Sequence, residues 1–194
     1  LSGITLSAPA GASVVTPLTT IIEEAGVSEE ELADALGLSG VELTSFNPYD
    51  TAQENYDLTK AVQAEKVAQQ IVNTVKVVAA AAQGAGVDTQ GSEEVALQAV
   101  ATAIVTNISN SKEAIASGEA SEIAVIDIAD ARTVGQVVEN AKTALTNSQT
   151  DNENFNSANL TAVSEVAKTA IQVVNEVVAE KSTEVLNSGD GLGD

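Results

Sequence analysis

The stretch that decides the fold is residues 51–83, TAQENYDLTKAVQAEKVAQQIVNTVKVVAAAAQ. Its apolar side chains recur at steps of three, four and five residues, which places them along one face of a helix. These side chains are Leu58, Val62, Val67, Ile71, Val75, Val78 and Ala82. Some thirty helical residues would span roughly 45 Å. The GAG sequence at 84–86 is expected to end this helix, which has the strongest helical pattern in the chain.

A second long helix is predicted for residues 157–186, SANLTAVSEVAKTAIQVVNEVVAEKSTEVL. Its apolar stripe has the same helical spacing. The expected buried residues are Leu160, Val163, Ala167, Ile171, Val174 and Val178.

Local start and stop signals predict two short helices near the N-terminus. Thr16 precedes Pro17, which stands at the favoured first helical position, and Gly26 closes the segment. Ser28 and Glu31 then have the spacing of a capping box. The two helices should form a hairpin whose inward side chains are Leu18, Ile21, Ile22, Leu32 and Leu36.

The middle of the chain predicts further helices at 92–109, at 110–118 and, with Asp130 as N-cap, at 131–146. The segment EIAVIDIAD (122–130) alternates Ile123, Val125 and Asp127, which suggests either a strand or an extended crossing.

The loop VELTSFNPYD (41–50) carries Phe46 and Tyr49, which we expect to fill one end of the bundle.

These segments together predict an all-α fold, a single bundle of six to seven helices with two long ones. Residues 1–15 should form a short extended entry segment and residues 16–186 the helical bundle domain. Residues 187–194 are interpreted as a linker and the start of a calcium-binding repeat.

Composition restricts the chemistry of this chain of 194 residues. It contains no His and no Cys, so imidazole bases, thiol nucleophiles and thiolate metal sites are excluded. We therefore expect a protein that is not an enzyme. Eight basic against 28 acidic residues give a net charge of −20, which disfavours nucleic acid and anionic lipid as partners. No stretch reaches the ~18 consecutive apolar residues of a membrane span, so membrane insertion is not expected.

Two acidic segments are candidate calcium sites, because hard carboxylate oxygens are the ligands that Ca²⁺ prefers. Asp190 and Asp194 lie in SGDGLGD (188–194), where the glycines permit tight turns. Asp151 and Glu153 lie in TDNENFN (150–156), whose amides could also converge on a cation. That second segment lacks the glycine turn and closing Glu of an EF-hand, so an ordinary polar connection is the alternative. No cofactor is expected to be required, and Ca²⁺ is the one ion considered.

Two resemblances to known protein families indicate where this chain is located and what kind of protein it belongs to. The terminal SGDGLGD resembles the opening of a thrombospondin type 3-like calcium repeat, without its upstream aspartate. Residues 6–38, LSAPAGASVVTPLTTIIEEAGVSEEELADALGL, followed by a long Ala/Val/Gln helix, resemble a helical module of very large secreted bacterial surface proteins. Those proteins carry cadherin-like or calcium-binding repeats and are described as adhesins. The resemblance implies an extracellular location at the bacterial cell surface and a segment of a longer polypeptide, as does a start without Met or a basic leader.

The function we expect is a non-enzymatic structural or interaction module, a spacer or docking domain, of such a protein. Its partners would be neighbouring domains of the same polypeptide and cell-surface or matrix components. The main alternative is a ligand-binding domain for a peptide, a glycan or a metal ion, using the aromatic residues Phe46, Tyr49, Tyr56 and Phe155. A hydrolase with a carboxylate pair, involving Asp50 or Asp151, is a third alternative.

Overall fold

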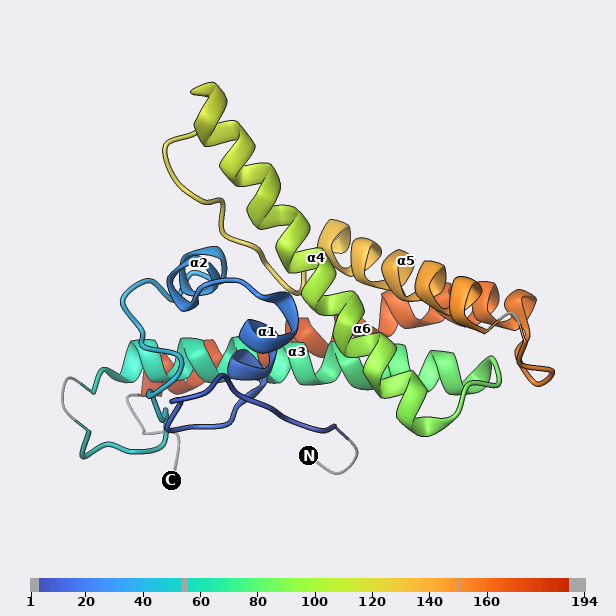
Figure 1. Cartoon of the computed structure of the whole chain (residues 1–194). Coiled ribbons are helices and arrows are strands. Elements are labelled where there is room, and N and C mark those ends of the chain that lie inside the picture. Colours follow the sequence, from blue (N-terminus) through green and yellow to red (C-terminus); the bar gives the residue numbers. More distant parts are fainter. Residues whose placement is uncertain (1–3, 54–55, 150, 189–194) are drawn as a thin grey trace.

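The computed structural model describes residues 4–53, 56–149 and 151–188, and it contains six helices (Figure 1). They are α1 (Pro17–Ala25), α2 (Glu29–Ala35), α3 (Leu58–Gly84), α4 (Thr89–Ser117), α5 (Ala131–Ser148) and α6 (Ser157–Ser188). The described residues form no strand. The predicted all-α bundle is therefore confirmed.

The centre of the bundle is the antiparallel pair of α3 and α6. The two helices pack along most of their length, with Gln70 and Thr74 beside Asn175 and Gly84 beside Val163. Helix α4 crosses α3 obliquely, and its C-terminal half projects beyond the other helices (Figure 1). Helix α5 packs on α4 and α6, while α1 fills the angle between α3 and α4.

The core is built almost entirely from Ala, Val, Ile and Leu. Alanines such as Ala64 on α3 and Ala99 and Ala103 on α4 are buried, and their small side chains let the helices approach closely. A smaller cluster closes the far end of α3; it consists of Ala82, Ala85, Val87, Leu145 and Leu160, with Phe155 packed against it. A core poor in aromatics is thus built from small aliphatic side chains, in one main cluster and a smaller one.

In its described part the entry segment forms no helix or strand, turns at Ala10 and Gly11, and is attached to α1 by polar contacts. The Ser7 N–H donates to Thr20 Oγ1 at 3.0 Å, and the hydroxyls of Thr19 and Thr20 both donate to the Ser7 carbonyl at 3.0 Å. Both threonine side chains are fully buried. These bonds explain why two polar residues occupy the inner face of a short helix.

The local capping predictions are confirmed. Thr16 caps α1, and Gly26 ends it in the left-handed conformation at φ 62°. The Ser28 hydroxyl accepts the Glu31 N–H while the Glu31 carboxylate accepts the Ser28 N–H, both at 3.2 Å. Asp130 caps α5 through the N–H groups of Arg132 and Thr133.

Two helix boundaries differ from the sequence expectation. Helix α3 begins at Leu58 rather than near Thr51, because Asp57 is its N-cap and the described residues before it form turns. The short helix predicted at 110–118 is the continuation of α4. Ser111 remains helical, with its hydroxyl donating to the Asn107 carbonyl one turn earlier at 3.0 Å. The bundle consequently has three long helices, α3, α4 and α6.

The segment 122–130 is an extended crossing, the second of the two conformations considered for it. The Ile126 N–H donates to the Ala35 carbonyl at 2.7 Å, and Ile126 and Ile128 are buried. Val125 is 67% exposed. Tertiary hydrogen bonds hold this crossing, among them those from the Ala124 N–H to Ser111 Oγ and from Asn175 Nδ2 to the Ile128 carbonyl, and periodicity cannot show them.

Candidate functional site

The loop that carries Asp151 and Glu153 is held by its amide side chains. Asn152 Nδ2 donates to the Gly86 carbonyl at 3.3 Å and to Gln149 Oε1 at 2.8 Å, and Asn152 Oδ1 accepts the Asn154 N–H at 3.0 Å. Asn156 Oδ1 accepts two N–H groups at the start of α6. The amide oxygens of Asn152 and Asn156 are therefore bonded to the backbone.

The carboxylates of Asp151 and Glu153 are themselves exposed. In the described parts of the chain, no three acidic residues are grouped in a way that could hold a metal ion. Calcium binding by Asp151 and Glu153 stays a prediction. Asp190 and Asp194, the other candidate calcium ligands, lie outside the described residues.

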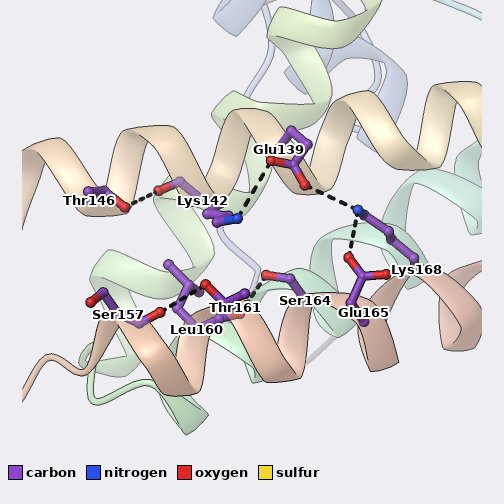
Figure 2. Close-up of polar contacts among 9 residues, drawn as sticks. All are labelled: Glu139, Lys142, Thr146, Ser157, Leu160, Thr161, Ser164, Glu165 and Lys168. Atoms are coloured by element: carbon purple, nitrogen blue, oxygen red, sulfur yellow. Dashed lines mark hydrogen bonds and ion pairs between the residues drawn. The ribbon is translucent and has the colours of Figure 1, made fainter.

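An ionic contact joins α5 to α6 (Figure 2). Lys168 Nζ lies 2.9 Å from Glu165 Oε1 and 3.1 Å from Glu139 Oε1, and Lys142 lies 3.9 Å from the other Glu139 oxygen. The hydrogen bonds to Glu165 and then Glu139 raise the pKa of Lys168 above its ordinary value. This network lies at the surface and pairs its charges locally, so we assign it a structural role.

A buried polar cluster lies between α3 and α6. Asn175 is fully buried, and its Nδ2 donates to Thr74 Oγ1 at 3.1 Å and to the Ile128 carbonyl at 3.5 Å. Gln70 Nε2 donates to the Asn175 carbonyl at 3.2 Å. Asn175 Oδ1 has no hydrogen-bond partner among the described residues. The cluster connects α3, α6 and the 122–130 crossing.

Three of the four aromatic residues gather around the loop that precedes α3. Phe46 is partly buried against the main core, as expected, but Tyr49 is 55% exposed and does not fill the end of the bundle. The Tyr56 hydroxyl donates to the Pro48 carbonyl at 3.4 Å. Phe155 packs in the separate cluster at the far end of α3. The aromatics therefore do not form one common platform for a sugar.

Beside Phe46 lies an apolar cavity of about 60 Å³. Its walls come from α1, the loop and α3, and include Leu18, Leu43, Phe46, Pro48, Ala64 and Ala68. Glu65 is the one ionisable residue among those lining it. Partial burial, together with the neighbouring Glu65 carboxylate, raises the pKa of Tyr49 to about 12. Sequence reasoning missed this site because three separate elements build it.

The acidic residues are distributed unevenly. Residues 1–57 contain no Lys or Arg and ten acidic residues, Glu23, Glu24, Glu29, Glu30, Glu31, Asp34, Glu42, Asp50, Glu54 and Asp57. Two of the three elements that line the cavity, α1 and the loop before α3, therefore come from a segment without basic residues, whereas α3 carries Lys60 and Lys66 near Glu65. Of the two carboxylates considered for hydrolysis, Asp50 accepts the Ala52 N–H at 3.0 Å in the loop before α3, whereas Asp151 lies in the loop before α6.

No family model, curated protein or solved structure matches the chain. Within the described ranges, no helix combines the length and apolar character needed to cross a membrane. Function must accordingly be argued from this structure and from the residues themselves.

Proposed function

We propose that this chain is a non-enzymatic structural module of a large extracellular bacterial surface protein, holding neighbouring domains of the same polypeptide at a fixed separation. The observation that carries the proposal is the antiparallel α3–α6 pair, whose packing runs from Gln70 and Asn175 to Gly84 and Val163. Helices of 27 and 32 residues span about 40 and 48 Å, respectively. Such a pair keeps its two ends at a fixed distance, because neither helix can bend without breaking its contacts with the other.

Two further features suit this role. Helices α4 and α5 pack against the pair, so the long helices are braced on the sides where they bury apolar residues. The net charge of −20 keeps the surface hydrated and disfavours nonspecific association. The resemblance to helical modules of bacterial adhesins supplies the extracellular setting.

The mechanical part of the proposal is tested by native-state hydrogen exchange at increasing urea concentration. We expect the central amides of α3 and α6 to become exposed together, in the step that also unfolds the whole domain. Exposure of α6 at much lower urea than α3 would contradict a rigid pair.

The setting is tested by protease treatment of intact cells that produce the parent polypeptide. Peptides from residues 16–186 should be released without cell lysis. Their recovery only after lysis would exclude a surface location, whatever the rigidity of the bundle.

A second candidate function, binding of a peptide, is favoured by the apolar cavity beside Glu65. It is compatible with the structural role, since the cavity lies at the α1 side of α3 and leaves the α3–α6 contacts untouched.

A further inference from the structure

The cavity beside Phe46 has a size that limits what can enter it. A single water needs roughly 10–15 Å³ by the same measure, so about 60 Å³ holds a short alkyl chain but is too small for an aromatic ring. Its lining residues are apolar apart from Thr16 and Glu65. An unbranched aliphatic stem is the side-chain shape that fits such a slot.

Glu65 is the charged residue among those that line this slot. Glu65 is half-buried, and its Oε1 accepts a hydrogen bond from Gln69 Nε2 at 2.7 Å. The Tyr49 hydroxyl is its other polar neighbour. Among the ion pairs of the described residues none involves Glu65, so the carboxylate is held by neutral donors. A cation would form a stronger, charge-assisted contact at this position.

The surroundings select for positive charge. The first 57 residues, which supply α1 and the loop wall of the cavity, carry ten acidic and no basic residues. A surface of one sign attracts ligands of the opposite sign and raises their local concentration. Phe46 lines the cavity and Tyr49 lies beside Glu65, and aromatic rings can attract a cation.

Lysine fits these features better than arginine. Gln69 already occupies one oxygen of Glu65, which removes the bidentate contact that a planar guanidinium prefers. A compact ammonium needs only one of the carboxylate lone pairs that Gln69 and Tyr49 leave open. Its four-carbon stem can lie along apolar walls while the charged end stays at the rim.

We propose that this cavity binds a lysine side chain of a partner polypeptide, with the stem between Phe46 and Ala68 and the ammonium at Glu65. The inference develops the second candidate function, peptide binding, and is independent of the structural role of the α3–α6 pair. In this proposal Glu65 recognises the charge of the lysine, and the cavity walls select side chains by the length of their aliphatic stem.

The test uses the intact chain and three blocked peptides, acetyl-Gly-Lys-Gly-amide and its norleucine and arginine counterparts. Binding is followed by NMR of isotope-labelled tyrosine rings. We expect saturable shifts of Tyr49 with the lysine peptide and at least tenfold weaker binding of norleucine, which keeps the stem and lacks the charge. Arginine should bind several-fold more weakly than lysine.

Two variants and one control locate the site. Glu65→Gln should weaken lysine binding at least tenfold, and Ala68→Val, which narrows the slot but keeps the carboxylate, should weaken it to a similar extent. Glu176→Gln removes an exposed carboxylate of α6 and should leave binding unchanged. Circular dichroism and the unfolding midpoint establish that each variant is folded.

Three results would overturn the proposal: no saturable shift with the lysine peptide, equal binding of lysine and norleucine, or equal losses in Glu65→Gln and Glu176→Gln. None of them would affect the structural role, which the exchange experiment on α3 and α6 tests separately.

Discussion

Among single residues, Asn175 departs most from the pattern of its own helix. The apolar periodicity of residues 157–186 predicts Val174 at the buried position, yet Val174 is 38% exposed and Asn175 is fully buried. Helix α6 is rotated so that the Asn175 amide reaches Thr74 and the Ile128 carbonyl. Periodicity alone cannot detect this rotation, because it depends on polar partners from α3 and from the 122–130 crossing.

Replacing Asn175 by Asp should make stability depend on pH. The variant has nearly the same shape but places a carboxylate in the core, and burial raises the pKa of such a group. Stability is therefore retained below its unfolded pKa of ~3.9 and lost as pH rises through the higher folded value. We expect a loss of about 3 kcal/mol at pH 7. Urea denaturation at pH 7 and at a pH below the unfolded pKa measures this loss. Asn175→Ala should lose about 2 kcal/mol at both of these pH values. A pH-independent loss in Asn175→Asp would contradict the burial of this side chain.

Two glycines with positive φ offer a matched comparison. Gly86 has φ +94°, and a Cβ placed there would lie 2.0 Å from the Asn154 carbonyl oxygen. Gly118 has φ +80°, but a Cβ there meets no atom within 4 Å. Gly118→Ala should thus cost about 1 kcal/mol from backbone strain alone. Gly86→Ala should cost more than ~2 kcal/mol, because the 151–156 loop must also move. Equal losses in urea denaturation would show that this close approach does not contribute to stability.

For helices and connecting segments, predictions from the sequence were correct where the deciding interactions join residues close together in the chain. The capping box of Ser28 and Glu31 and the N-cap at Asp130 lie within four residues of their partners, and the structure confirms both. The continuity of α4 through Ser111 and the path of residues 122–130 depend on packing against other elements. The cavity beside Phe46 was missed for the same reason, since no continuous stretch of sequence contains it.

The ion pair between Lys112 and Glu31 links α4 to α2 and should produce a small pH effect. The hydrogen bond from Lys112 lowers the pKa of Glu31 below 4.5, with a further contribution from the Ser28 N–H. Because the folded pKa is lowered, this stabilisation is present above pH 4.5 and is lost as pH falls through the lower folded value. Lys112→Ala should cost less than about 1 kcal/mol at pH 7, since the pair is exposed to solvent.

The measurement for this pair is the unfolding midpoint of wild type and Lys112→Ala between neutral and acidic pH. The difference should shrink as Glu31 becomes protonated. Lys76→Ala, which removes an exposed lysine that makes none of the described ion pairs, controls for the change in net charge. If the difference in unfolding midpoint between wild type and Lys112→Ala is unchanged in acid, Lys112 stabilises the protein through packing and not through its charge.

For the whole molecule, repulsion among 28 acidic residues opposes compaction, and ten of them lie in the first 57 residues. Salt should relieve this repulsion, because the Debye length falls from about 30 Å at 0.01 M to about 3 Å at 1 M. We therefore expect the thermal unfolding midpoint to rise with NaCl over this range. The exposed ion pairs are weakened by the same salt, but they are few and individually weak.

A variant with fewer acidic residues distinguishes this charge repulsion from the general effect of salt on the burial of apolar surface. Glu23, Glu24 and Glu30 are exposed, and changing all three to Gln alters the net charge from −20 to −20 + 3 = −17. The variant should unfold at a higher temperature than wild type at low salt, and the two midpoints should converge at ~1 M NaCl, where screening is nearly complete. A gap that stays constant with salt would mean that these glutamates affect stability through local contacts. The acidity of the first 57 residues would then contribute to the attraction of ligands without a measurable cost to folding.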